Sequence, residues 1–162
     1  MRIIFVEPQS CLTCHSCTLA CSLSHASSQD LLSVLLAGEV SPARIFIVAQ
    51  GNLSGIVTCR HCLSPPCLKA CPTQAIQRNP RTGAVIINEE LCIGCRDCLV
   101  ACPFGAIILE AGKAIKCDLC QGDPACVKVC PTKAIQFLDT EEEVRARRQR
   151  AISKLFPQRR AV

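Results

Sequence analysis

Sixteen cysteines, arranged in four groups of four, constrain this chain of 162 residues more than any other feature. The first and third groups have the spacing C-x2-C-x2-C-x3-C, and the other two have one gap lengthened. Outside these groups the sequence offers little that could perform chemistry. The groups are Cys11, Cys14, Cys17, Cys21; Cys59, Cys62, Cys67, Cys71; Cys92, Cys95, Cys98, Cys102; and Cys117, Cys120, Cys126, Cys130.

Three kinds of cysteine chemistry compete for this pattern. Disulfides are disfavoured because no secretory signal is apparent: Met1-Arg2 leads directly into the strand-like stretch 3–6. Zinc sites with four cysteines usually draw two ligands from each of two separated knuckles. Zinc would also leave no role for the repeated Cys-Pro that closes the last three groups. Iron–sulfur clusters are therefore the favoured interpretation, with a zinc-stabilised interaction module as the structural alternative.

The third group reproduces the signature of bacterial ferredoxins in Cys92-Ile-Gly-Cys95-Arg-Asp-Cys98-Leu-Val-Ala-Cys102-Pro103. Three cysteines at i, i+3 and i+6 can wrap one face of a [4Fe–4S] cubane. The fourth, on the helix that follows, points towards a neighbouring cluster, as in two-cluster ferredoxins. The spacing therefore predicts four clusters whose ligands are exchanged between groups, and hence electron transfer.

Composition agrees with an interior filled by clusters. The chain has no Trp, no Tyr and five Phe, too few large side chains for an ordinary core. Folding and metal binding are then expected to be one process. The conspicuous apolar run at 31–37 is much shorter than the roughly 20 residues that a membrane helix needs. We therefore expect a soluble, cytoplasmic protein without a membrane span.

Charge is distributed unevenly along the chain. The formal net charge is +5, but four oxidised clusters, each about −2 with its thiolates, would lower it by about 8 to about −3. Residues 1–144 hold all 13 acidic and 11 basic side chains, whereas residues 145–162 hold seven basic side chains and no acid. Without Trp or Tyr for base stacking, nucleic-acid binding is not expected.

An internal repeat, Cys-Pro-x-x-Ala-Ile, begins at Cys71, Cys102 and Cys130. Proline should end each cysteine-bearing helix, and Ala-Ile should begin a short, core-packed strand. Asn79–Gly83 is typical of a hairpin turn between strands near 76–78 and 84–87. The first group lacks this proline. It is followed by a segment without cysteine, 22–58, which we interpret as an insertion with a strand near 45–48 and an apolar helix near 31–37. This helix is expected to cover a cluster, and contact with a partner is the alternative.

The C-terminal segment predicts a charged helix over about 141–156. Thr140 and Glu143 fit a capping box, with Thr140 as the N-cap. An apolar stripe would be formed by Val144, Ala151, Ile152 and Leu155. An exposed helix and a docking helix are both compatible with this pattern.

The order and spacing of the four groups resemble the four-cluster ferredoxin-like electron-transfer subunits of prokaryotic redox complexes. These accompany carbon monoxide dehydrogenases, tungsten or molybdenum aldehyde oxidoreductases, formate dehydrogenases, formate-linked hydrogenases and the dimethyl sulfoxide reductase group. The resemblance is strongest in Cys59-Arg-His-Cys62-Leu-Ser-Pro-Pro-Cys67 and Lys116-Cys117-Asp118-Leu119-Cys120. Some relatives replace one ligand or carry a C-terminal membrane helix, and this sequence shows neither departure.

This resemblance implies a pairing of the first group with the fourth and of the second with the third. Cluster A would be held by Cys11, Cys14, Cys17 and Cys130; cluster B by Cys59, Cys62, Cys67 and Cys102; cluster C by Cys92, Cys95, Cys98 and Cys71; and cluster D by Cys117, Cys120, Cys126 and Cys21. It also implies an α+β fold of two pseudo-symmetric dicluster ferredoxin-like halves with short helices and hairpins. The four-cluster domain would span 1–139, and the basic helix or tail 140–162.

The expected function is a non-catalytic electron relay between a catalytic oxidoreductase subunit of the aldehyde, carbon monoxide or formate type and a second redox partner. Further copies of the chain could also be partners. The alternatives are a free polyferredoxin and a self-contained reductase, which would need a cluster with an open iron site. His15 and His61 are expected beside clusters or at the surface, because each group already has four cysteines. Several basic residues neighbour the ligands and should raise cluster potentials: Arg60, Lys69, Arg96, Lys116 and Lys128.

Overall fold

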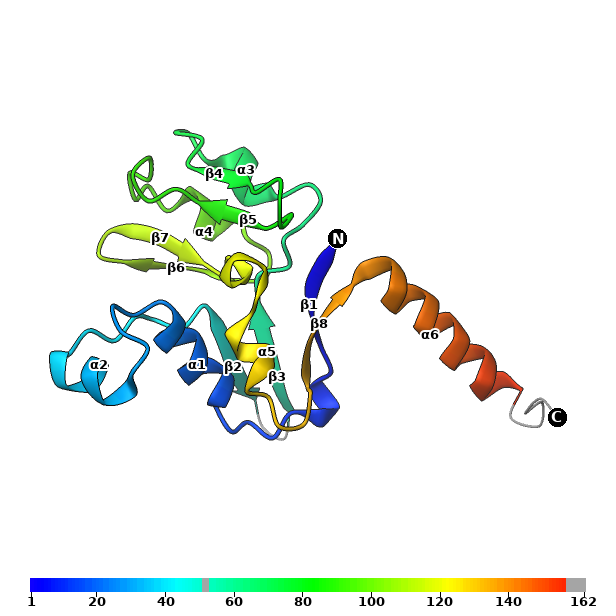
Figure 1. Cartoon of the computed structure of the whole chain (residues 1–162). Helices are drawn as coiled ribbons and strands as arrows, with labels where there is room; N and C mark the ends of the chain where they lie inside the picture. Colours follow the sequence, from blue (N-terminus) through cyan, green and yellow to red (C-terminus); the bar gives the residue numbers. More distant parts are fainter. Residues whose placement is uncertain (51–52, 157–162) are drawn as a thin grey trace.

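The computed structural model describes residues 1–50 and 53–156 as a body of short hairpins and helices with one projecting helix (Figure 1). Within these residues the strands form four two-stranded antiparallel sheets. The elements, in chain order, are β1 (Arg2–Val6), η1 (Pro8–Ser10), α1 (Ser16–Ser24), α2 (Leu31–Ala37), β2 (Ile45–Gln50), β3 (Leu53–Thr58), α3 (Pro66–Ala70), β4 (Ile76–Arg78), β5 (Val85–Ile87), α4 (Asp97–Ala101), β6 (Ile107–Glu110), β7 (Lys113–Lys116), η2 (Leu119–Gly122), α5 (Ala125–Lys128), β8 (Ile135–Asp139) and α6 (Thr140–Leu155).

Three of the sheets are hairpins of consecutive strands, and the fourth joins the two ends of the body. The hairpins are β2–β3, β4–β5 and β6–β7. In the fourth sheet β1 pairs with β8, so that Ile4 lies opposite Phe137. Helix α1 packs against α5, and α3 packs against α4. The first cysteine group therefore lies beside the fourth, and the second lies beside the third.

The buried side chains form two clusters that follow the same division. One contains Cys17 and Cys21 from the first group, Cys117 and Cys126 from the fourth, and isoleucines from β1, β2, β3 and β8. The other contains Cys67 from the second group and Cys92 and Cys98 from the third, with Ile76, Val85 and Ile107. Cysteines thus occupy positions that large apolar residues would fill in an ordinary core.

The repeat found in the sequence is also a repeat of structure. After each Cys-Pro pair the chain makes the same turn, in which the third residue after the cysteine has positive φ and its amide donates to the cysteine carbonyl: Gln74 to Cys71, Gly105 to Cys102 and Lys133 to Cys130, at 3.2–3.3 Å. The alanines that follow are 1% exposed, and the isoleucines begin β4, β6 and β8. The predicted core packing and strand starts are confirmed.

Other predicted elements are confirmed with small shifts. The hairpin turn at 79–83 is closed by hydrogen bonds between Asn79 and Gly83 and between Asn79 and Ala84, and β5 begins at Val85. Helix α2 has the predicted bounds, and β2 extends two residues beyond the predicted strand. In α2 only Val34 is buried, whereas Leu32 and Leu36 are 63% and 81% exposed. Most of the apolar surface of α2 therefore faces solvent.

The predicted capping box of the last helix is wrong. Asp139, the last residue of β8, is the N-cap, and its Oδ1 accepts from the Glu141 amide at 2.9 Å. The Thr140 hydroxyl instead donates to the Met1 carbonyl at 2.7 Å, because Thr140 still borders the β1–β8 sheet. Glu143 cannot close the box, since its carboxylate accepts from Arg147 and Arg150.

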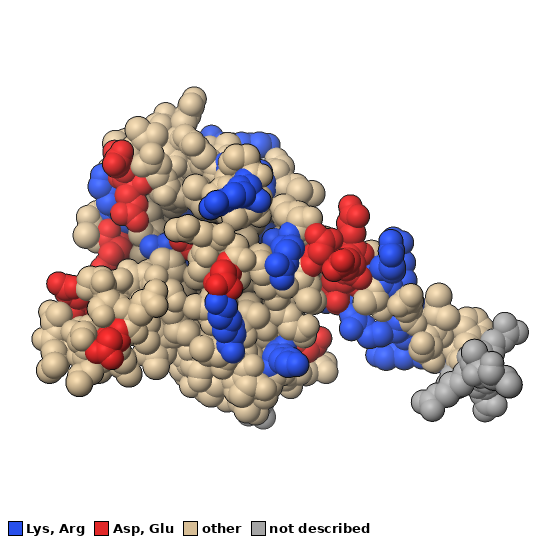
Figure 2. All heavy atoms as spheres, viewed as in Figure 1, with Lys and Arg blue, Asp and Glu red and all other residues tan. Residues whose placement is uncertain are grey.

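Helix α6 leaves the body at its acidic first turn and carries its basic residues outward, as Figure 2 shows. The predicted apolar stripe is largely exposed: Val144, Ile152 and Leu155 are 41%, 59% and 73% accessible. Residues 157–162, the rest of the predicted basic tail, lie outside the described residues. Across residues 1–50 and 53–156, no helix has the length and apolarity that crossing a membrane requires.

Candidate metal centres

Each cysteine group places its third member on a helix and its fourth at or near the end of that helix. The third members are Cys17 in α1, Cys67 in α3, Cys98 in α4 and Cys126 in α5. The sequence placed only the fourth cysteine on the helix, but in the last three groups the helix ends before it. Cys71 and Cys102 are C-caps, and Cys130 follows α5. Because proline lacks an amide hydrogen, α3 and α4 stop at the cysteines before Pro72 and Pro103, whereas α5 has already ended at Lys128, before Pro131.

Two cavities are lined by four cysteines each. One is lined by Cys59, Cys62 and Cys67 of the second group together with Cys102 of the third. The other is lined by Cys92, Cys95 and Cys98 of the third group together with Cys71 of the second. These are the sets that the family resemblance assigned to clusters B and C. Each cavity thus takes three thiols from one group and one from the other.

The remaining eight cysteines lie around the contact between α1 and α5. Burial is the main reason why the pKa of Cys126 is raised, and the next causes are the thiols of Cys117, Cys21 and Cys120. These four residues are the set assigned to cluster D. For Cys17 burial again comes first, and the neighbouring thiols that raise its pKa belong to Cys11 and Cys14. The ligation of all four clusters by these sets stays a prediction.

The donor groups suit a cationic metal cluster. All sixteen cysteines lie in the described part of the chain, and all are free thiols. Burial raises the pKa of Cys98 to about 11 and that of Cys117 to about 12, so these thiols would not ionise at neutral pH on their own. Metal coordination deprotonates a thiol and supplies the missing positive charge. Buried thiols in sets of four therefore fit iron–sulfur ligation.

Backbone amides also point at several of these sulfurs. The Arg44 amide donates to Cys21 Sγ at 3.2 Å, and the amides of Thr13, His61 and Ala114 donate to Cys11, Cys59 and Cys92 at 3.4 Å. Such hydrogen bonds stabilise negative charge on a sulfur ligand. Thr13 and His61, whose amides donate to the cysteine two residues earlier in each case, both have positive φ. Gly94 is required in its loop because a Cβ there would lie 2.2 Å from the Gly112 carbonyl oxygen.

A charged network beside the fourth group was missed by the sequence analysis. His25 Nε2 lies 3.2 Å from Asp118 Oδ1, and Arg44 donates to Asp118 Oδ2 at 3.2 Å. The Asp118 carboxylate, followed by the Cys21 side chain, raises the pKa of His25 to about 10. Burial alone would raise the pKa of Asp118, but hydrogen bonds from His25 and the Cys120 amide lower it. His25 lies one helical turn beyond Cys21, which was the only sequence signal for it.

The two histidines singled out by the sequence have different environments. His15 is exposed and is the N-cap of α1, with a φ of 59°. His61 is 1% exposed and lines the cavity of Cys59, Cys62, Cys67 and Cys102. Its Nδ1 accepts from the Val85 amide at 2.9 Å, so Nε2 carries the proton of the neutral ring. Burial, followed by the charge of Lys116, lowers the pKa of His61 to about 3.

The basic residues near the ligands also differ. Lys128 is exposed and pairs with Asp123. The Arg60 guanidinium lies 5.8 Å from the centre of the Phe104 ring. Lys116 alone among the five named residues is buried, at 3% exposure. Arg60 and Lys116 both line the cavity shared by the second and third groups.

A family model and full-length relatives agree with this site, and one solved structure is also similar to the chain. The family model of the 4Fe-4S dicluster domain matches residues 56–140. An iron-sulfur protein of Rhodospirillum rubrum is 38% identical over 94% of this chain and 91% of its own length. The electron transport protein HydN of Escherichia coli is 35% identical over 96% of this chain and 99% of its own. A chain of the active site complex BamBC of benzoyl coenzyme A reductase aligns with 98% of this chain and 92% of its own at a TM-score of 0.46 and 18% identity.

The match to the family model covers the last three cysteine groups, and the two relatives extend the similarity over almost the whole chain. The fold mixes short helices with strands, and the cysteines lie in sets suited to [4Fe–4S] clusters. The chain belongs to the family of [4Fe–4S] ferredoxin-like electron-transfer proteins.

Proposed function

We propose that this chain holds four [4Fe–4S] clusters and serves as a non-catalytic relay subunit between a catalytic oxidoreductase subunit and a second redox partner. The observation that carries the proposal is the composition of the two four-cysteine cavities, each with three thiols from one group and one from another. Such exchange is the ligand pattern of two-cluster ferredoxins. The same exchange between the first and fourth groups would give clusters A and D. When bound, each cluster accepts and releases one electron.

The effects of neighbouring thiols on one another's pKa favour a single series of clusters, in the order C, B, D, A. The thiol of Cys67, from set B, raises the pKa of Cys98 in set C. The thiol of Cys59, also from set B, raises the pKa of Cys117 in set D. Cys17 of set A in turn raises the pKa of Cys126 in set D. The two exposed cysteines, Cys14 and Cys95, belong to sets A and C at the ends of this series. Partners are therefore expected to exchange electrons at these two ends.

The same division supports the domain organisation expected from the sequence. Residues 1–139 would form two pseudo-symmetric dicluster halves, with 22–58 as an insertion in the half that holds clusters A and D. In support of this role, the Arg44 amide of this segment donates to Cys21, and Ile45 and Ile56 join the core that surrounds the first and fourth groups. Residues 140–162 would form a separate docking element.

Electron counting tests the relay. Reductive titration of the anaerobic protein with titanium(III) citrate is expected to consume about four electrons per chain, one for each cluster. Reoxidation by a viologen dye should return all of them, because the chain has no substrate of its own. Uptake of two electrons per chain would contradict the four-cluster relay, and uptake of none would favour a zinc module.

The catalytic partner is proposed to be an aldehyde oxidoreductase, carbon monoxide dehydrogenase or formate dehydrogenase type of subunit. The support is the family resemblance of the cysteine motifs together with the name of the relative HydN, an electron transport protein. A large subunit that purifies with the native protein would identify the partner directly. A redox protein of another class in that position would contradict this choice.

Deletion of 140–162 is expected to leave all clusters assembled but to weaken partner binding at least tenfold, or about 1.4 kcal/mol. Helix α6 projects from the body and carries exposed basic and apolar side chains, including Arg145 and Arg148 (Figure 2). The measurement is the Kd for the co-purifying partner at low and high salt, together with the iron content. Salt should weaken the intact complex, because the Debye length falls from about 10 Å at 0.1 M to about 3 Å at 1 M.

A double variant, Arg145→Gln with Arg148→Gln, separates charge from length, since glutamine keeps high helix propensity. It should reproduce part of the loss and reduce the salt dependence. If deletion removes clusters, α6 is part of the fold. Unchanged affinity after deletion would show that α6 does not dock the partner.

A further inference from the structure

Lys116 is a buried lysine that has no carboxylate partner within the part of the chain that the structure describes. It is the last residue of strand β7 and is 3% exposed. Nζ donates to the carbonyl oxygen of Cys117 at 2.8 Å and to that of Val85. Among the described residues, none of the ion pairs within 4.0 Å includes Lys116. A buried cation is costly unless an opposite charge compensates it, so this side chain requires a negative group.

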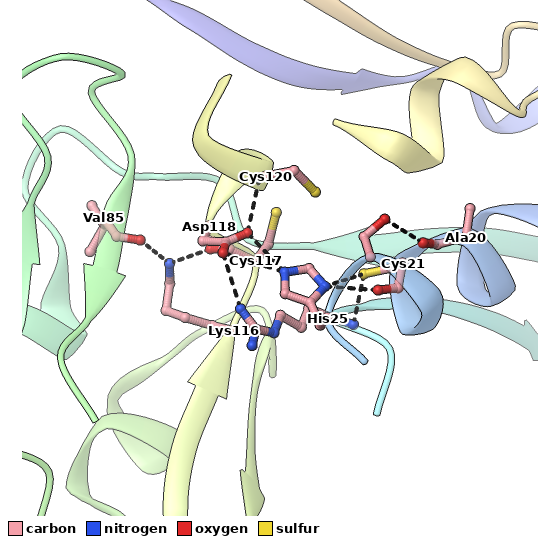
Figure 3. A network of polar contacts seen from close by, with 10 residues as sticks. Ala20, Cys21, His25, Val85, Lys116, Cys117, Asp118 and Cys120 are labelled. Carbon is pink, nitrogen blue, oxygen red and sulfur yellow. Dashed lines mark hydrogen bonds and ion pairs between the residues drawn. The ribbon is translucent and has the colours of Figure 1, made fainter. Parts of the chain in front are cut away.

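The nearby carboxylate of Asp118 does not supply that charge. Figure 3 shows Asp118 directed at His25, while Lys116 reaches between Val85 and Cys117. Asp118 also accepts from Arg44 and from the Cys120 amide, so two basic side chains already share its charge. The negative group opposite Lys116 must therefore come from the cysteine sulfurs and what they bind.

Lys116 lies between two cysteine sets. It lines the cavity of Cys59, Cys62, Cys67 and Cys102, assigned to cluster B. The residue after it, Cys117, is a ligand assigned to cluster D. The thiols of Cys67 and Cys117 both experience its charge, which favours the thiolate of each. An oxidised [4Fe–4S] cluster with four thiolates carries about −2, and reduction adds a further negative charge.

Backbone hydrogen bonds hold the lysine in this position. The Val85 carbonyl accepts from Lys116 while the Val85 amide donates to His61 Nδ1, so one strand residue joins the lysine to the cavity of cluster B. The other ring nitrogen of His61, Nε2, is buried and has no hydrogen-bond partner among the described residues. As a lining residue of that cavity, it offers its proton to an acceptor there. Two buried donors thus lack an anionic partner at the same place.

We propose that Lys116 is the shared counter-charge of clusters B and D and raises the reduction potentials of both. This inference rests on the proposed function, because it uses the positions assigned to these two clusters. A fixed positive charge beside both central clusters stabilises their reduced states. An electron that enters at the exposed cysteines of either end is therefore drawn to the middle of the series. Clusters A and C lack this contribution.

The test is a potentiometric titration of the intact protein, followed by electron paramagnetic resonance, with three variants at one position. Lys116→Met removes the charge and the donor. Lys116→Gln removes the charge and keeps an amide donor, and Lys116→Arg keeps the charge. In the Met and Gln variants, the reduction potentials of two of the four one-electron steps should fall by at least about 59 mV. This shift corresponds to a tenfold change in the ratio of reduced to oxidised cluster. The other two steps should stay in place, and Lys116→Arg should leave all four nearly unchanged.

Lys113→Met is the matched control, because Lys113 lies on the same strand and donates to the Cys92 carbonyl at 2.6 Å, beside cluster C. It is partly exposed, so water screens its charge and any shift should be small and confined to one step. If Lys116→Met fails to assemble clusters, the comparison of Gln with Arg decides the question.

Four unmoved steps in Lys116→Gln, or equal shifts in Gln and Arg, would overturn the proposed role of the charge. Iron and sulfide analysis of each variant separates this result from a failure of the four-cluster assignment. A wild-type protein with fewer than four clusters contradicts the proposed function. A wild-type protein with four clusters and unmoved potentials in Lys116→Gln contradicts only the role of Lys116.

Discussion

Anaerobically isolated protein is expected to contain about sixteen iron and about sixteen acid-labile sulfide per chain, from four clusters of four. Chelation of this iron should unfold the body, because cysteine side chains make up much of both hydrophobic cores. The chain has no Trp or Tyr that could fill the space without the metal. Iron and sulfide analysis gives the first quantity, and far-ultraviolet circular dichroism before and after chelation gives the second.

The zinc alternative makes the opposite prediction for the same sample. Stoichiometric zinc with little sulfide and a colourless protein would end the iron–sulfur interpretation. About eight iron per chain would support iron–sulfur ligation but with only two clusters. Retention of the native dichroism after complete removal of metal would contradict the coupling of folding to cluster binding.

Replacement of Cys21 by serine is expected to damage the cluster of the fourth cysteine group and to leave that of the first group nearly intact. Cys21 is 6% exposed and lies on α1, which packs against α5. Its thiol is among the groups that raise the pKa of Cys120 and Cys126. The sulfur of Cys21 would therefore be lost from cluster D, although the residue belongs to the first group. About a quarter of the iron should be lost or converted to a three-iron form, as Mössbauer spectroscopy can measure.

Cys14→Ser is the matched control from the same group. Cys14 is exposed, and its thiol raises the pKa of Cys17, which is assigned to the same cluster. Replacement of Cys14 should therefore damage cluster A. The double variant should then lose two clusters. If Cys21→Ser and Cys14→Ser damage the same cluster, ligands are not exchanged between the first and fourth groups.

Local sequence patterns were enough to predict the parts of this protein that depend on neighbouring residues. Proline after Cys71 and Cys102 stops the helix before it because proline has no amide hydrogen, and the isoleucine of each Ala-Ile begins a strand in all three copies of the repeat. The turn at 79–83 was likewise predictable, because Asn79 and Gly83 form it by themselves. The capping of α6 was not, because the choice between Thr140 and Asp139 depends on the sheet partner of β8.

The four groups of cysteines by themselves determined that this chain binds metal clusters and transfers electrons, because ligand type and spacing are local properties. Only the tertiary structure decided which groups lie together, since the pairing of β1 with β8 and of α1 with α5 joins residues more than 100 positions apart. It also decided that Lys116 is buried with no carboxylate beside it among residues 1–50 and 53–156, while Lys128 is exposed and paired with Asp123. Each of the two lysines lies within two residues of a predicted ligand. The charge that a cluster experiences depends on burial and distance, which are set by the packing of strands and helices distant in sequence.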